Sequence, residues 1–110
     1  MTTWFRTYDA EDDVWVHYEA DDGGWAVRQV DIRAADSRPV TAASLDELAP
    51  LRGDLPAMDR YERQYGVLAE GLLDGWQDQP HATEIPRQEF ERLWAEARRT
   101  LGGETAWQAD

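Results

Sequence analysis

The chain has 110 residues, no cysteine, and 23 acidic against 11 basic side chains, which gives a formal net charge of −12 at pH 7. This length predicts one domain with its own hydrophobic core. The lack of cysteine excludes disulfides and zinc–thiolate sites and fits a reducing compartment, so we expect the cytoplasm. No apolar run reaches the roughly 18 residues of a membrane-spanning helix, and the first residues lack the basic start and apolar stretch of a secretion signal.

The negative charge is spread over the whole chain, and every basic side chain is an arginine. Residues 1–55 carry 12 acids and 5 arginines, and residues 56–110 carry 11 acids and 6 arginines. Such a field repels nucleic acid phosphates and anionic lipids and attracts basic proteins. We therefore expect a basic protein partner and no binding to nucleic acid or membranes. The alternative is that the acidity only keeps the protein soluble.

The N-terminal half reads as a series of antiparallel strands. Alternating side chains predict strands at 3–9, 14–20 and about 25–34, and a short edge strand at 40–42. The clearest hairpin signal is the turn cluster Asp21-Asp22-Gly23-Gly24 between the second and third strands. The apolar face changes along 25–34, which predicts a bulge in that strand.

The C-terminal half reads as helices. The capping-box spacing from Ser44 to Glu47 predicts a short helical turn that ends at Pro50. A longer helix is predicted from the cap Asp54 to a stop at Gly75, with a break as an alternative near Gly66. Its apolar stripe is Met58, Tyr61, Tyr65, Leu68 and Leu72.

The last helix has the clearest pattern. It is predicted to begin at Pro86 and to end at Gly102-Gly103. Its apolar stripe is Phe90, Leu93, Trp94, Ala97 and Leu101. Because this stripe and that of 54–75 are each one-sided, we expect both segments to pack on the same face of the sheet.

These elements predict a single α+β domain over residues 1–103. The N-terminal meander forms a three- to four-stranded antiparallel sheet, and two to three helices pack on one face of it. Residues 104–110 are expected to form a frayed C-terminal tail.

Two phrases of the sequence carry a resemblance. They are Tyr18-Glu19 followed by Arg28-Gln29-Val30-Asp31-Ile32, and the later run Glu84-Ile85-Pro86-Arg87-Gln88-Glu89-Phe90-Glu91-Arg92-Leu93-Trp94. Together they resemble a family of small acidic actinobacterial proteins of unknown function, although Pro86 stands where that family more often has a capping serine. Helices like the second phrase also end many unrelated small proteins, several immunity proteins among them. The resemblance implies a fold and no activity.

Signals for catalysis are weak. The chain has no nucleophile elbow, phosphate-binding glycine loop or dinucleotide fingerprint. His17 and Glu19 share a strand face and could act as acid and base, with Arg28 as a further polar group; a hydrogen-bonded structural histidine is the alternative. The acidic clusters lack the spacing of a calcium-binding loop, so we predict no metal and no cofactor.

Candidates for partner binding are the acidic turns and the tryptophans beside them. They are Asp9, Glu11, Asp12, Asp13, Asp21, Asp22, Trp15 and Trp25. The chain has six tryptophans. Trp94 lies on a core stripe and should be structural, whereas those on the strands belong either to the core or to an exposed binding patch.

Composition, charge and resemblance favour a small acidic, non-enzymatic binding protein, an inhibitor or immunity-like factor for a basic partner. The alternative is a small-molecule enzyme or carrier with an aromatic-lined pocket between sheet and helices. A structural or assembly role is a third hypothesis. A flat acidic face with exposed aromatics would favour the first, and a pocket deeper than a side chain the second.

Overall fold

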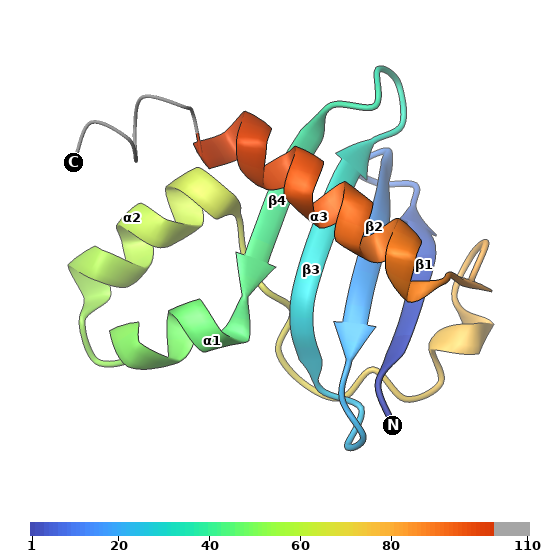
Figure 1. Cartoon of the computed structure of the whole chain (residues 1–110), viewed down its shortest axis with the longest axis horizontal. Coiled ribbons are helices and arrows are strands. Elements are labelled where there is room, and N and C mark those ends of the chain that lie inside the picture. The colour runs from blue at the N-terminus through green and yellow to red at the C-terminus, as the bar shows by residue number, and fades with distance from the viewer. Residues whose placement is uncertain (103–110) are drawn as a thin grey trace.

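The computed structural model describes residues 1–102 and has an α+β fold built on a five-stranded antiparallel sheet (Figure 1). The strands are β1 (Thr3–Asp9), β2 (Val14–Ala20), β3 (Ala26–Arg33), β4 (Pro39–Ser44) and β5 (Thr83–Glu84), in the order β4-β3-β2-β1-β5. The predicted class and the N-terminal meander are confirmed. The sheet has one strand more than predicted, because the two residues of β5 are too few to show an alternating pattern.

The helices flank and cover this sheet. They are α1 (Leu45–Leu48), the 3₁₀ turn η1 (Ala49–Leu51), α2 (Leu55–Tyr65), the 3₁₀ turn η2 (Trp76–Asp78) and α3 (Arg87–Gly102). The side chain of Asp54 caps α2 by accepting a hydrogen bond of 3.1 Å from the amide of Ala57, as predicted. The side chain of Ser44 does not cap α1. None of the helices within residues 1–102 is long and apolar enough to cross a membrane.

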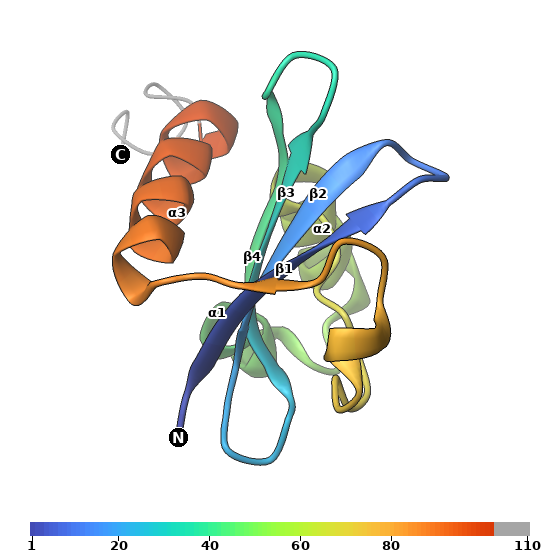
Figure 2. The same ribbon diagram turned by 90° about the vertical axis from the view of Figure 1, so that its right-hand side faces the viewer.

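The two faces of the sheet have different covers. Helix α3 lies on one side, and the connector, which we define as residues 66–82, runs on the other (Figure 2). Under α3, Val30 and Ala42 are paired on neighbouring strands and pack with Phe90. On the connector side, Ala43 packs with Leu68. Because adjacent residues of a strand point to opposite faces, Ala42 and Ala43 belong to two separate cores.

The predicted helix over 54–75 is interrupted where the alternative placed the break. Helix α2 ends at Tyr65, and Gly66 adopts a φ of 85°. Leu68 and Leu72 therefore leave the helical stripe: Leu68 enters the core on the connector side, and Leu72 pairs with Trp25.

The expectation that 54–75 packs on the same sheet face as the last helix is wrong. Of the helices within residues 1–102, only α3 lies across a sheet face, and α1 and α2 lie beyond the β4 edge (Figure 1). The physical reason is that both faces carry buried side chains, Phe5 on one and Val30 on the other, so each face needs its own cover. Trp94 packs against the α3-side core, as predicted. The predicted tail at 104–110 lies outside the described residues.

Gly66 gives a test of this break. A β-carbon at Gly66 would meet the Thr41 side chain at 2.5 Å, whereas at Gly53, with a similar φ of +89°, it would meet nothing within 4 Å. The free energy of unfolding of Gly53→Ala should therefore fall by only about 1–2 kcal/mol, the cost of a left-handed backbone at a residue with a β-carbon. Gly66→Ala should lose a further 1–3 kcal/mol, roughly, from overpacking. Urea melts of both variants measure the difference; equal losses would contradict the close packing of Gly66 on β4.

Candidate functional site

Arg28, a predicted polar candidate, lies between two carboxylates under α3. Its Nε donates to Glu19 Oε1 at 2.6 Å, and its Nη2 donates to Glu91 Oε2 at 2.7 Å. The guanidinium makes a second contact with each partner, at 3.1 Å to Glu19 and 3.0 Å to Glu91. The Trp4 indole also donates to Glu19, at 3.0 Å. We call Arg28, Glu19, Glu91 and Trp4 the clamp. It joins β1, β2, β3 and α3.

The clamp is charged and closed. Burial alone would lower the pKa of Arg28, but the hydrogen bonds that it donates to Glu19 and Glu91 outweigh this effect and raise that pKa. The hydrogen bond from Arg28 in turn lowers the pKa of Glu91. The Phe90 and Trp94 rings each lie 5.0 Å from the guanidinium carbon. Arg28 and Glu19 are thereby occupied in holding α3 on the sheet.

His17 is also engaged inside the fold. It is 4% exposed, and its Nδ1 lies 3.1 Å from the carbonyl oxygen of Val30. Burial lowers its pKa, so the imidazole is neutral near pH 7. His17 and Glu19 lie on one strand face as predicted, but their partners are Val30 for His17 and Arg28 and Trp4 for Glu19.

The first acidic turn joins β1 and β2. Asp9 Oδ1 accepts a hydrogen bond of 3.0 Å from the Glu11 amide and one of 3.4 Å from the Asp12 amide. Asp13 accepts a hydrogen bond from the Tyr8 hydroxyl. These carboxylates shape their own turn and leave their other oxygens toward solvent.

Trp15, beside this turn, is packed on several sides. The Arg6 guanidinium lies 4.6 Å from its ring, and the rings of Tyr8 and His81 lie 5.1 Å and 6.0 Å away. Trp15 is only partly exposed, so less of its side chain is accessible to a partner than in a fully exposed tryptophan.

The second acidic turn joins β2 and β3 at the other end of the strands (Figure 1). Asp21 Oδ1 accepts hydrogen bonds of 3.0 Å from the amides of Gly23 and Trp25. Asp22 forms an exposed ion pair with the amino group of Met1. The eight partner-binding candidates are therefore divided between two ends of the sheet.

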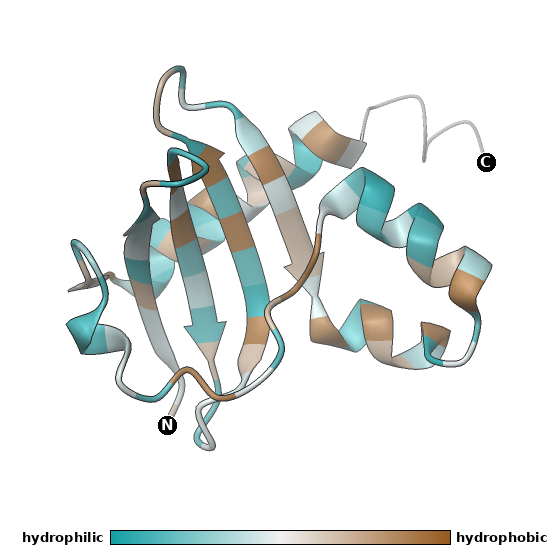
Figure 3. Ribbon diagram, turned by 180° about the vertical axis from the view of Figure 1, so that it is seen from behind, coloured by the Kyte–Doolittle hydropathy of each residue, from teal (hydrophilic) through white to brown (hydrophobic). Residues whose placement is uncertain are grey.

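Trp25 forms an exposed apolar patch with the connector. It is 49% exposed and pairs through an isolated β-bridge with Leu72, which is 54% exposed. The amide of Leu73 donates to the Gly24 carbonyl at 2.8 Å. The hydrophobic stretch of the connector crosses close to this turn (Figure 3). We call these two side chains the Trp25–Leu72 patch.

Acidic residues alone flank this patch in sequence. Asp21 and Asp22 precede Trp25, and Glu70 and Asp74 flank Leu72. Neither 9–27 nor 66–82 contains an arginine or lysine. Sequence reasoning missed Leu72 because its spacing fitted the helical stripe; Gly66 and Gly71, which interrupt that stripe, were the available signal.

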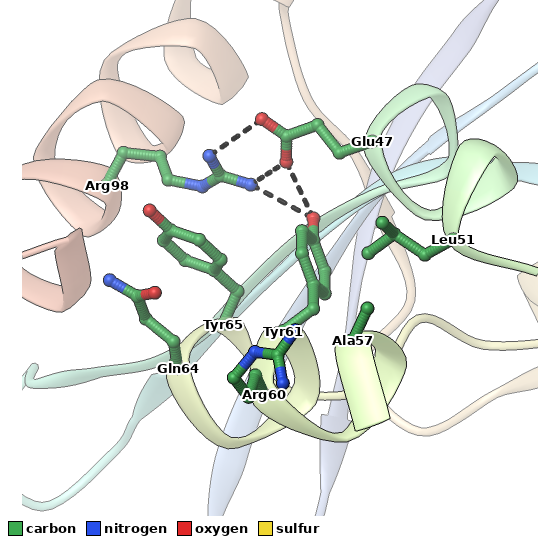
Figure 4. A pocket seen from close by; sticks show the side chains of 8 residues that line it. All are labelled: Glu47, Leu51, Ala57, Arg60, Tyr61, Gln64, Tyr65 and Arg98. Atoms are coloured by element: carbon green, nitrogen blue, oxygen red, sulfur yellow. Dashed lines mark hydrogen bonds and ion pairs between the residues drawn. The ribbon is translucent and has the colours of Figure 1, made fainter. Parts of the chain in front are cut away.

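A cavity opens between α1, α2 and α3 (Figure 4). Its volume is about 780 Å³. The lining residues are Glu47, Leu51, Ala57, Arg60, Tyr61, Gln64, Tyr65 and Arg98. The predicted pocket lay between sheet and helices and used His17, Glu19 or Arg28; none of these three lines this cavity.

One wall of the cavity is a hydrogen-bonded network. Arg98 forms an ion pair with Glu47 and donates to the Tyr61 hydroxyl at 3.1 Å and to the Ala42 carbonyl at 2.9 Å. Tyr61 in turn donates to Glu47 Oε1 at 2.6 Å. Burial opposes the charge on Glu47, but the bonds from Arg98 and Tyr61 outweigh it and lower the pKa of that carboxyl. Glu47 is thus ionised at neutral pH, and both of its oxygens accept hydrogen bonds.

Neither a metal site in the described part of the chain nor a match to a known protein indicates a function. Within residues 1–102 the structure contains no group of three or more histidine, aspartate or glutamate side chains that could hold a metal ion. No protein-family model matches the chain, and no curated protein or solved structure matches it either. The indications of function therefore come from the contacts, charges and exposure of this chain's own residues.

The burial of His17 predicts a pH dependence of stability. Its pKa lies below the ordinary 6.5 in the folded protein. The unfolded chain therefore takes up a proton near pH 6.5 that the folded protein refuses, so the free energy of unfolding falls as the pH drops below about 6.5. The slope is at most about 1.4 kcal/mol per pH unit. Urea melts between pH 7.5 and 5 measure it.

His17→Gln should flatten this slope, and the matched variant His81→Gln, at an exposed position, should keep it. The carboxylates with lowered pKa values, such as Glu47 and Glu91, titrate below this window. An unchanged slope in His17→Gln would contradict the assignment.

Proposed function

We propose that this protein is a small acidic, non-enzymatic binding protein, an inhibitor or immunity-like factor, that uses the Trp25–Leu72 patch to bind a basic partner protein. One observation carries the proposal: the half-exposed Trp25 and Leu72 lie side by side in segments whose charged residues are all acidic. A large aromatic side chain next to an aliphatic one is a common anchor of protein interfaces.

Charge complementarity favours a basic partner. The net charge of −12 favours encounter with a basic surface, and carboxylates at the rim of an interface act mainly on the association rate. The turn with Asp9, Glu11, Asp12 and Asp13, at the other end of the sheet, adds to this long-range attraction. Binding to nucleic acid or anionic lipid is disfavoured by the same charge. A cytoplasmic location is part of this proposal, and a chain without cysteine fits that reducing compartment.

The candidate catalytic residues are engaged in contacts within the fold, which favours a binding function over catalysis. Arg28 is held by Glu19 and Glu91, and His17 is buried with a carbonyl partner. A general acid or base needs a proton-accepting atom within reach of a substrate. Arg28 is engaged by two carboxylates and His17 by the Val30 carbonyl, so neither is presented to a substrate.

A second candidate function, a small-molecule carrier, is favoured by the cavity between α1, α2 and α3. Its volume of about 780 Å³ exceeds that of a side chain and lies in the range of ligand pockets. Among the described lining residues Glu47 is the one carboxylate, and both of its oxygens are engaged by Arg98 and Tyr61. This favours a carrier over an enzyme.

The binding proposal is tested on the basic protein captured by the immobilised full chain from the native host. Trp25→Ala should raise the dissociation rate at least tenfold, roughly, as expected for an aromatic anchor. Asp21→Asn with Asp22→Asn should lower the association rate and its dependence on salt, because asparagine keeps the turn's acceptor oxygens but removes the charge.

The control pair Asp59→Asn with Glu96→Gln removes the same charge from α2 and α3. It should slow association less than the pair at the patch. Surface-plasmon kinetics at two salt concentrations distinguish the variants. An association rate indifferent to salt and to both pairs, with unchanged dissociation in Trp25→Ala, would reduce the acidity to a solubility feature.

A further inference from the structure

The cavity between α1, α2 and α3 has walls and polar groups that select a class of ligand. We infer that it binds a small organic anion with a flat apolar body, such as an aromatic carboxylate. The inference rests on the carrier alternative and is independent of the Trp25–Leu72 patch, which lies on the β2–β3 turn and the connector.

The walls fit a flat apolar body. Tyr65 is 5% exposed, and its ring lies 5.2 Å from that of Tyr61 on the preceding turn of α2. Leu51 and Ala57 form the opposite side, and Figure 4 shows the tyrosines between them and Arg98. Flat rings stack on aromatic side chains and on the planes of guanidinium groups.

The frame around the cavity is fixed before any ligand arrives. Arg98 on α3 joins Glu47 of α1, Tyr61 of α2 and the Ala42 carbonyl of β4. The amide of Ser44 donates a further hydrogen bond of 2.8 Å to the Tyr61 hydroxyl. A preformed pocket loses less entropy on binding than one that must be assembled.

A cationic ligand would find its usual partners taken. Glu47 is already paired with Arg98. The Arg98 guanidinium carbon also lies 3.7 Å from the centre of the Tyr65 ring, where the charge of a ligand cation would otherwise sit. The cavity therefore carries its own internal cation.

Among the charged groups of the described lining, the one that remains for a ligand is a cation. Arg60 lines the cavity, and within residues 1–102 it forms neither an ion pair nor a side-chain hydrogen bond. Its neighbour on the same helix, Arg63, is paired with Asp59. The Tyr65 hydroxyl likewise has no hydrogen-bond partner within the described range. A guanidinium suits a carboxylate, which accepts its hydrogen bonds.

Three isosteric probes test the charge preference: 2-naphthoate, 2-naphthamide and 2-naphthylmethylammonium. Each is titrated into the full chain and followed by calorimetry and by backbone amide shifts in ¹H–¹⁵N spectra. Naphthoate should bind at least about fivefold more tightly than the neutral amide, the size of one exposed charge-assisted contact, and the ammonium probe should bind most weakly. The shifts should centre on 57–65 and on Glu47.

Arg60→Gln should weaken naphthoate binding about fivefold, and Arg63→Gln, the matched charge change on α2, should leave it unchanged. Both side chains are exposed, so neither variant should impair folding. Trp25→Ala should keep naphthoate binding, so that failure of this site and failure of the partner proposal can be told apart. No binding, equal affinities for the three probes, equal effects of the two arginine variants, or shifts centred on 21–25 and 70–74 would each overturn the inference.

Discussion

The structure depends on one arginine held between two carboxylates. Arg28 rises from β3, contacts Glu19 on the neighbouring strand and reaches Glu91 on α3. The side chains of Arg28 and Glu19 are only 18% and 13% exposed, so their charges are largely withdrawn from water. A withdrawn charge is costly without its partner, so the sheet and α3 must stay together for each to satisfy the other.

Arg98 does at the other end of α3 what Arg28 does near its start. It fastens the helix to α1, α2 and β4 and so fixes the wall of the cavity. In a chain with twice as many acids as bases, these two arginines are directed inward, and the surface keeps its acidity. The proposed binding patch and the proposed ligand site both follow from this arrangement. The patch lies in segments without arginine, and the ligand site contains Arg60, which forms no ion pair within residues 1–102.

Local patterns in the sequence predicted much of this fold. Alternation placed β1, β2 and β3 and the hairpin at Asp21–Gly24, and the stripe from Phe90 to Leu101 placed α3. The connector escaped prediction because its leucines continue the helical spacing of α2 although it forms no α-helix, and because distant contacts hold it, such as the amide of Ala69 with the Gln29 side chain at 2.8 Å. Spacing alone read Leu68 and Leu72 as one stripe, although a glycine with positive φ separates them from α2.

The Trp25–Leu72 patch, the contacts of Arg28 and the cavity were harder to predict than the fold. Each is assembled from residues that are far apart in the sequence. Trp25 was identified beside its turn, but its partner Leu72 comes from a segment 47 positions later. Strand alternation predicts Glu19 and Arg28 as polar groups of a site, but it cannot show that Arg28 is paired with Glu91, 63 positions away. The cavity needs three helices whose relative placement no short pattern encodes.

The most direct test of the clamp is the free energy of unfolding of Arg28→Met. Methionine keeps much of the apolar length but leaves Glu19 and Glu91 without their cation, so we expect a loss of about 3 kcal/mol. The control Arg92→Met removes an arginine that is 65% exposed and pairs with Glu96 on α3, and it should cost less than about 1 kcal/mol. Urea melts of the two variants at pH 7 provide the comparison. A loss in Arg28→Met no larger than in Arg92→Met would contradict the dependence of the fold on this interaction.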